Sequence, residues 1–244
     1  MYRVLTIAAV GLMLVACAYQ APVGVSPNLN VYSSYGDKLP GTFALFVSSD
    51  GFVQDVKPTG LSCSYHHFPL DVQAQFKESV VKTVQQLVEN VEVVDQPLSG
   101  SELAASGKRG MIVVRADTMV ARIQFIPGFW TATGDANVDL SANMTVDTQG
   151  GRLLGTTAEG TGNATGEAGQ LCGGGANVIG QATEKAMKQL LGQLGERLSN
   201  SPRLRGTAYE ASPPPLGPDA APAAPPRRAS HCVRVVTDPS QTQC

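Results

Sequence analysis

Basic residues are not in excess in this sequence, and histidine and tryptophan are scarce. The 18 lysines and arginines are set against 20 aspartates and glutamates, which gives a formal net charge of −2 at pH 7. Nucleic-acid-binding proteins normally carry a basic patch or stripe, so this balance argues against a nucleic-acid partner. The chain has one tryptophan and three histidines in 244 residues. Three histidines offer few imidazoles to act as a catalytic base or to bind a metal.

Motifs of common catalytic and nucleotide-binding sites are missing as well. The G-x-S-x-G elbow of serine hydrolases does not occur. Gly175–Gly180 has the glycine spacing of a phosphate-binding loop, but Gln181 and Ala182 stand where the lysine and the serine or threonine belong. Asp139 and Asp147 fall on the wet face of a predicted strand, where solvated carboxylates are ordinary. We therefore expect a non-catalytic protein without catalytic residues and without a cofactor.

The apolar run at the amino terminus is short. Val4–Leu14 is uncharged and nearly all apolar, which is about half of the roughly 20 residues that a membrane-spanning helix needs. Arg3 precedes the run and the small residue Ala16 follows it, as in a secretory signal peptide. We predict that residues 1–16 are removed.

Leu14-Val15-Ala16-Cys17 resembles the bacterial lipobox, in which the cysteine receives acyl chains and becomes the first residue of the mature protein. The resemblance implies an anchor on the membrane through lipid on Cys17. An aspartate after the cysteine marks retention in the inner membrane, and this chain has Ala18 there. The expected location is therefore the bacterial outer membrane, facing the periplasm. The alternative is an ordinary signal peptide cut near Ala16 or Ala18, with Cys17 incidental.

Four cysteines remain after Cys17, an even number for an oxidising compartment. They predict two disulfides, for which three pairings exist. We favour Cys63 with Cys172, because both lie in the folded body, and Cys232 with Cys244, because both lie in a separate tail. The alternative is four free thiols.

One cysteine also lies beside two histidines, in the segment Cys63-Ser-Tyr-His66-His67. Such a cluster could bind zinc or copper, but a metal site usually needs a fourth ligand or a second cluster. The remaining histidine, His231, is remote in the sequence. We therefore favour a loop that holds a disulfide cysteine and expect no metal.

Composition divides the chain into five parts. A proline- and alanine-rich stretch at 211–228 cannot form a core and predicts a semi-extended spacer. The predicted parts are a signal peptide at 1–16, a lipidated N-terminus and polar tether at 17–41, an α+β periplasmic domain at 42–204, a linker at 205–228 and a cysteine-containing tail at 229–244.

Hydrophobic periodicity predicts the elements of the domain. Val138, Leu140, Ala142, Met144 and Val146 alternate with polar residues, as in a strand with one buried face. Further strands are predicted at 42–49, 91–96, 111–125 and 152–160, with helices at 176–199 and from Asp71, the predicted N-cap, to about residue 88. This order, β-α-β-β-β-β-α, predicts an α+β two-layer sandwich, with a mainly antiparallel four- to five-stranded sheet and two helices on one face.

The order of elements, the C-terminal helix pattern from Ala176 to Pro202 and the lipobox together resemble the YajG-like family of bacterial outer-membrane lipoproteins. The likeness covers about residues 42–202 and lies in patterns of apolar residues. It implies a location and a fold more than an activity. The spacer and the cysteine tail depart from that pattern, so the family role does not transfer simply.

One apolar segment, Ile123–Trp130, contains the only tryptophan beside Pro127 and Gly128. It falls between two predicted strands, so it is either core folded over the sheet or an exposed contact for a partner protein or acyl chain. The residues proposed for that contact are Ile123, Phe125, Ile126, Phe129 and Trp130.

Two functional hypotheses follow. The first is an interaction or assembly accessory for an envelope component, with an unidentified envelope protein as partner. The alternative is a periplasmic lipoprotein that binds a lipid-like molecule between sheet and helices, or that serves in lipopolysaccharide assembly, since lipopolysaccharide-assembly lipoproteins have a comparable plan.

Overall fold

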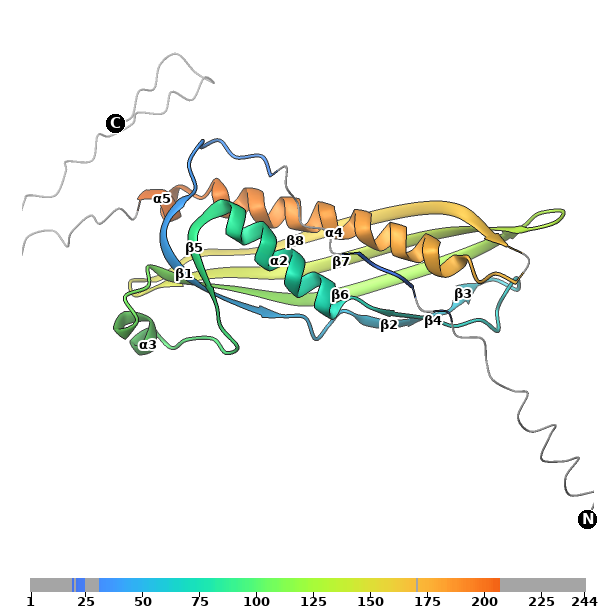
Figure 1. The fold of residues 1–244 in the computed structure, drawn as a ribbon, viewed down its shortest axis with the longest axis horizontal. Helices are drawn as coiled ribbons and strands as arrows, with labels where there is room; N and C mark the ends of the chain where they lie inside the picture. The colour runs from blue at the N-terminus through green and yellow to red at the C-terminus, as the bar shows by residue number, and fades with distance from the viewer. Residues whose placement is uncertain (1–18, 20, 25–30, 170, 207–244) are drawn as a thin grey trace, which may run out of the picture. The chain divides into compact units, whose positions relative to one another are not determined.

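The computed structural model of the chain describes residues 19, 21–24, 31–169 and 171–206. Contacts divide the chain into one unit at 1–207 and a second at 208–244, which lies outside the described residues. The elements of the first unit (Figure 1) are β1 (Leu39–Ser48), β2 (Val53–Val56), β3 (Pro58–Thr59), β4 (Phe68–Asp71), α2 (Gln73–Leu87), β5 (Val88–Val93), α3 (Gly100–Ala105), β6 (Gly110–Pro127), β7 (Ala132–Thr148), β8 (Gly151–Gly169), α4 (Gly175–Ser199) and α5 (Pro202–Gly206).

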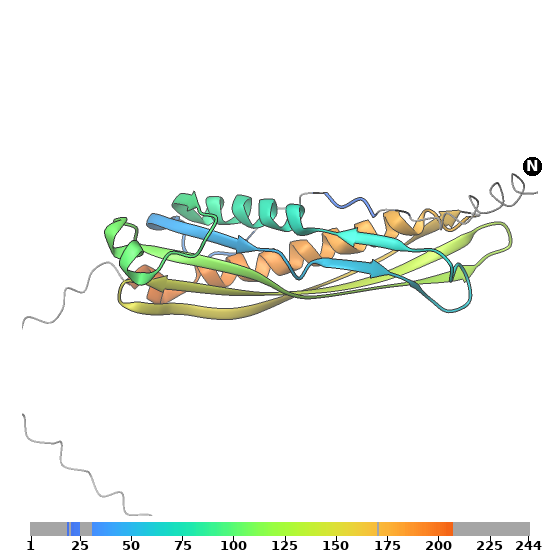
Figure 2. The ribbon, with the colours of Figure 1, turned by 90° about the horizontal axis from the view of Figure 1, so that it is seen from below.

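A six-stranded mixed sheet forms the body. Its order is β5-β1-β6-β7-β8, with β3 beside β6. Strands β6, β7 and β8 are antiparallel and contain 18, 17 and 19 residues, so they run roughly 60 Å along the body at about 3.3 Å per residue (Figure 2). β1 pairs in parallel with both β5 and β6.

The α+β class and the large sheet are thus confirmed, whereas the details of the predicted plan change. The sheet is mixed and has six strands, and the described residues form four helices. The two additional helices and the two-stranded sheet of β2 and β4 are only four to six residues long. Elements this short leave little periodicity in a sequence.

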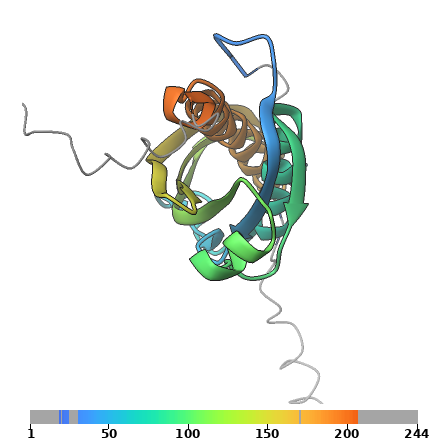
Figure 3. The same cartoon turned by 90° about the vertical axis from the view of Figure 1, so that its left-hand side faces the viewer.

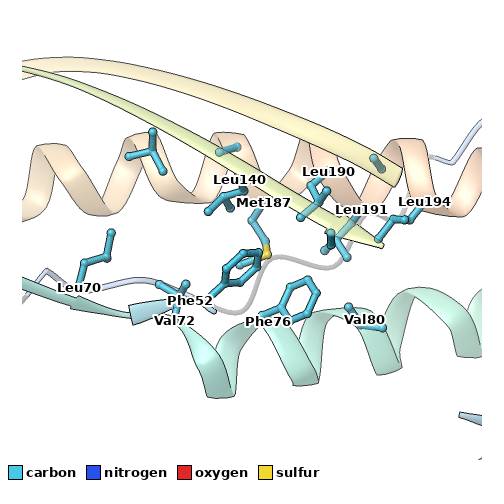
Figure 4. Packing of buried hydrophobic residues seen from close by; sticks show 14 of the residues in the cluster. Phe52, Leu70, Val72, Phe76, Val80, Leu140, Met187, Leu190, Leu191 and Leu194 are labelled. Carbon is cyan, nitrogen blue, oxygen red and sulfur yellow. The ribbon is translucent and has the colours of Figure 1, made fainter. Parts of the chain in front are cut away.

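The two long helices cover one face of the sheet, as predicted. All five alternating apolar residues of β7 are buried there. Val72, Phe76, Val80 and Val84 of the α2 segment are at most 5% exposed and belong to the same core cluster. Figure 4 shows Val72, Phe76 and Val80 opposite Met187 and the labelled leucines of α4. Viewed along the body (Figure 3), the sheet forms an arc beside α4 and α2.

The start of α2 differs slightly from the prediction. Its N-cap is Val72, which has no side chain able to cap the helix. Asp71, one residue earlier, still accepts a hydrogen bond from the Gln73 backbone N–H at 3.0 Å. Asp71 is therefore not the N-cap, but its carboxylate accepts a hydrogen bond from one of the unpaired amides of the first turn.

The short helix α3 lies over the opposite face of the sheet. Its Leu103 packs with Ala44, Met111 and Val113 in a separate small cluster. These sheet residues alternate with the core residues of β1 and β6, so they point away from α2 and α4. Ser99 and Glu102 form a capping box at the start of α3, and the hydrogen bonds from Ser99 lower the pKa of the Glu102 carboxyl.

Helix α4 approaches β8 closely because the inner face of β8 has only small side chains. The residues that face the helix are Ala158, Gly160, Gly162, Ala164, Gly166 and Ala168. A Cβ atom on Gly162 would lie 1.9 Å from the Ala182 carbonyl oxygen, and one on Gly160 would lie 2.1 Å from that of Ala186. Backbone contact of this kind is compatible only with glycine at these two positions.

The free edge of β8 is hydrogen-bonded by α4 side chains. The pairs are Lys185 with Asn163, Gln189 with Thr161, Gln193 with Glu159 and Arg197 with Thr157. The bonded residues recur every four positions in α4 and every two positions in β8. Four helical residues rise about 6 Å and two strand residues about 6.6 Å, so the helix side chains stay opposite their partners in the strand. These side chains occupy backbone groups that would otherwise be open to another strand.

The segment predicted as a tether, 17–41, is bonded to the body at several of its described residues. The Tyr19 N–H donates to the His67 carbonyl at 3.1 Å, and the Gly24 N–H donates to the Glu184 carboxylate at 3.0 Å. At Tyr19 and Gly24 the chain is therefore held on the body and does not hang free as a tether would. The sequence did not indicate this, because the segment uses backbone hydrogen bonds, which leave no pattern of apolar side chains.

Two glycines of α4 make room for this N-terminal segment. A Cβ atom on Gly180 would lie 2.1 Å from the Pro22 carbonyl oxygen, and one on Gly195 would lie 2.7 Å from a Val31 methyl group. Pro22 and Val31 therefore lie along α4 in the same order as the helix residues that they meet. Among the described residues, no helix is both long enough and apolar enough to span a membrane.

Candidate interaction surface

The turn between β6 and β7 exposes two large aromatic side chains. Phe129 is 90% exposed and Trp130 is 77% exposed, and their rings meet edge to face at 4.8 Å. The Gly128 N–H donates to the Thr131 carbonyl at 2.9 Å, which makes the turn tight. Tight hairpin turns favour glycine, asparagine and aspartate, so turn chemistry does not account for two aromatic residues here.

Two further loops expose apolar side chains close by. Leu61 and Tyr65 lie in the loop between β3 and β4, and Leu171 lies in the segment before α4; all three are more than 70% exposed. A disulfide between Cys63 and Cys172 joins these two loops across 109 residues of sequence. The structure thus contains the pairing that the sequence analysis favoured.

Strand pairing brings all three loops to one end of the body. Pro58 of β3 pairs with Ile123 of β6, and Gly169 of β8 pairs with Ala132 of β7. The loop after β3 and the segment after β8 therefore begin next to the base of the β6–β7 turn. In Figures 1 and 2 this end carries the β6–β7 hairpin and the start of α4.

We call this surface the apolar end. It is defined by Leu61, Tyr65, Ile126, Phe129, Trp130 and Leu171, which are six of the eleven exposed large apolar residues in the described chain. The loop sequences 60–66, 126–134 and 169–177 contain no aspartate, glutamate, lysine or arginine. Exposed apolar groups gathered in this way mark sites of interaction.

The five contact residues predicted from the sequence divide into two groups. Ile126, Phe129 and Trp130 are exposed at the apolar end, whereas Ile123 and Phe125 are 1% and 4% exposed and belong to the core. The two buried residues cannot contact a partner, because they lie on the inner face of β6. The core interpretation is therefore confirmed for Ile123 and Phe125, and a contact through Ile126, Phe129 and Trp130 stays a prediction.

Sequence reasoning missed Leu61, Tyr65 and Leu171. The available signal was the absence of charge around Cys63 and around Cys172, which the disulfide prediction already linked. Isolated apolar residues in loops are common on protein surfaces. These three residues could be recognised as part of one exposed apolar surface only once the fold placed them beside the aromatic turn.

Tyr19 and His66 lie beneath the exposed loops. The two rings are 5.6 Å apart, and the Tyr19 ring lies against Gly173. His66 is 3% exposed, and neither of its ring nitrogens has a hydrogen-bond partner among the described residues. It packs between the rings of Tyr65 and Phe68.

The cysteine and histidine cluster does not converge on one point. The sulfur of Cys63 is in the disulfide, and His67 Nδ1 lies 2.9 Å from the Asp55 carboxylate. Within the described ranges, no group of three histidine, cysteine, aspartate or glutamate side chains is placed to bind a metal ion. Cys17, Cys232 and Cys244 lie outside the described residues, so their predicted roles stay predictions.

Side chains fill the space between α2, α4 and the middle of the sheet, whereas an open hollow of about 540 Å³ lies between β8 and the ends of α4 and α5. A cavity enclosed by α2, α4 and the sheet measures about 10 Å³ and is lined by Val84, Met144 and Leu194 among others. A single water molecule needs about that much. Near Phe125, where a lipid-like ligand was considered, the ring instead packs against Phe68 at 5.9 Å and against Gly175.

No family model matches the chain, and no curated protein matches it. Among solved structures it is similar to a Xanthomonas campestris protein of family DUF330, with a TM-score of 0.40, 11% identity and coverage of 78% of this chain and 96% of the other. It is also similar to a hypothetical protein of Chlamydia trachomatis, with a TM-score of 0.34, 8% identity and coverage of 64% and 96%. A third similar structure is a minor lipoprotein of Acinetobacter baumannii, with a TM-score of 0.30, 10% identity and coverage of 64% and 91%.

All three TM-scores are below 0.5, so these likenesses are partial and do not extend to a function. None of the three is described as a YajG-like protein, and that resemblance stays a prediction.

Proposed function

We propose that this chain is a non-catalytic lipoprotein, anchored in the bacterial outer membrane through Cys17 and facing the periplasm. There it serves as an interaction or assembly accessory for an envelope component. One observation carries the proposal: Tyr19, two residues after Cys17, is packed at the same end of the body as the apolar end. The end that would be tied to the membrane is thus also the end that exposes apolar side chains.

The accessory role rests on the opposite end of the body. Helix α5 contacts β8 and β1, and it lies at the end of the sheet away from the β6–β7 turn (Figure 1). Residues 207–244, with the proline- and alanine-rich stretch, continue from there. We expect an envelope partner to bind the chain through this segment.

Filling of the interior argues against the alternative of a bound lipid-like molecule. An acyl chain in the core between α2, α4 and the middle of the sheet would have to displace side chains, because the cavity there is about 10 Å³. Removing large core side chains costs about 2–5 kcal/mol each. The accessory role requires no such rearrangement.

The anchor is tested by Cys17→Ser. We expect the substitution to abolish labelling by a palmitate analogue and to release the protein from the membrane fraction or leave it as unprocessed precursor. The physical reason is that each buried CH₂ of an acyl chain contributes about 0.8 kcal/mol of membrane affinity, and this variant has no chain. Ala18→Ser is the control, since it leaves the thiol in place. Unchanged labelling and retention of the Cys17→Ser variant would exclude the anchor.

The accessory role is tested by affinity capture from detergent-solubilised envelopes after crosslinking. We expect the full chain to recover a protein partner in stoichiometric amount, and a variant that ends at Gly206 to lose it. Thermal unfolding of the truncated variant is the control, because residues 208–244 form a unit separate from the body and the midpoint should not move. Capture of no stoichiometric partner by the full chain would contradict the role.

A further inference from the structure

We infer that the apolar end is a membrane-contact surface, which rests in the interfacial layer of the phospholipid leaflet. This inference rests on the proposed anchor and deepens it. It assigns the exposed side chains to lipid and not to the protein partner. It also sets the direction of the body relative to the membrane.

The covalent chain limits how far the apolar end can be from the anchor. Two residues span at most about 7 Å, so Cys17 cannot lie farther than that from the Tyr19 backbone. Tyr19 in turn contacts Gly173, which directly follows the disulfide cysteine Cys172. Acyl chains on Cys17 would therefore enter the leaflet beside the loops of the apolar end. A protein partner would have to reach these loops between the body and the lipid.

The composition of the loops matches the chemistry of that layer. Tyrosine and tryptophan favour membrane interfaces because one part of the side chain is apolar and another part hydrogen-bonds with water. Tyr65 and Trp130 are of this kind, and Phe129, Ile126 and Leu171 add apolar surface. The loop sequences carry no charged residue, and the nearest charges in the adjoining strands are Asp135 and Glu167.

Backbone chemistry sets the depth of the contact. Irregular loops cannot lie in the hydrocarbon region, because their free N–H and C=O groups would have no partner there. Phe129 and Trp130 are at a turn, where only some backbone groups are paired. The side chains therefore reach toward the acyl region while the turn itself stays among the headgroups. The disulfide and the strand pairs hold the three loops together in this arrangement.

The test uses the full mature chain with Cys17→Ser, which has no acyl group, and vesicles of phosphatidylethanolamine and phosphatidylglycerol. Trp130 is the only tryptophan, so its emission reports on this surface alone. We expect a shift to shorter wavelength when vesicles are added, and quenching when the lipid chains carry bromine. An emission that does not respond to either vesicle would overturn the inference.

Matched substitutions locate the contact. Phe129→Ser is expected to weaken vesicle binding about tenfold, the effect of losing part of the burial of one phenylalanine. Tyr32→Ser is the control, because Tyr32 is 70% exposed and its carbonyl is bonded to Asn200 near the end of α4, away from the apolar end. Both variants should keep the unfolding midpoint. Equal vesicle binding by the two variants would overturn the inference.

Sedimentation separates lipid from a second copy of the chain. If the apolar end joins two copies, the unlipidated protein sediments as a dimer that Phe129→Ser converts to a monomer, and this result would overturn the lipid assignment. A monomer that binds vesicles through Trp130 supports it. Because this protein lacks the acyl group, the outcome is independent of acyl labelling. Acyl labelling can therefore exclude the anchor while vesicle binding supports the membrane contact, and vesicle binding can exclude the contact while labelling supports the anchor.

Discussion

Gly162→Ala is expected to lower the free energy of unfolding by about 3 kcal/mol, the upper part of the range for overpacked interiors. The added Cβ atom would lie 1.9 Å from the Ala182 carbonyl oxygen and 2.6 Å from the Ala186 backbone nitrogen. Both atoms belong to the backbone of α4, which cannot rotate away as a side chain can. The helix must instead move off β8, and this loosens the adjacent contacts between them.

Gly155→Ala on the same strand is the matched control. A Cβ atom at this position would meet only the Arg152 side chain, at 3.6 Å. Alanine restricts the unfolded chain more than glycine does, so this variant should be unchanged or more stable by up to about 1 kcal/mol. Urea unfolding followed by circular dichroism measures both. A similar loss in the two variants would show that strand conformation, and not the approach of α4, decides the cost.

The sequence predicted those parts of the fold that bury large apolar side chains. β7 and α2 were predicted because valine, leucine and phenylalanine recur there with the period of a strand or a helix. The second half of β8 was missed because alanine and glycine occupy its inner face, and glycine is a weak strand former. The alternation of small and polar residues was present from Ala158 to Ala168, but it has little hydrophobic contrast.

Contacts made by backbone groups were the other part that sequence reasoning did not reach. The bond from Tyr19 to His67 involves no side-chain oxygen or nitrogen, so any residue with an N–H could make it. The pairing of the mixed sheet also depends on backbone hydrogen bonds between distant segments, because β1 joins β6 across more than sixty residues. Composition limits such pairings only weakly, and the tertiary arrangement decides them.

Sequence analysis identified the aromatic turn of the apolar end and missed the exposed residues of the two neighbouring loops. Phe129 and Trp130 were identified because two aromatic residues beside Pro127 and Gly128 are unusual in a turn. Whether they were core or surface depended on the length of β6 and β7, which carries the turn past the helices. Periodicity does not determine strand ends closely enough to decide this.

The disulfide at the apolar end is expected to contribute about 4 kcal/mol to stability. Its two cysteines are 109 residues apart, and closing a loop of that length restricts the unfolded chain strongly. The double variant Cys63→Ser, Cys172→Ser should lose about that much in urea unfolding. Cys232→Ser with Cys244→Ser is the control for altered thiol content, and it should leave the unfolding of the body unchanged because these residues belong to the separate second unit.

A second double variant separates the cross-link from the backbone around it. Cys63 and Cys172 have φ angles of 61° and 58°, in the left-handed region that costs about 1–2 kcal/mol for a residue with a Cβ atom. Serine keeps that cost, whereas glycine removes it and instead loses about 0.5–1 kcal/mol of chain entropy. Cys63→Gly, Cys172→Gly should therefore be less destabilised than the serine pair. If the serine pair loses less than about 1 kcal/mol, the link contributes little, and strand pairing alone holds the three loops of the apolar end together.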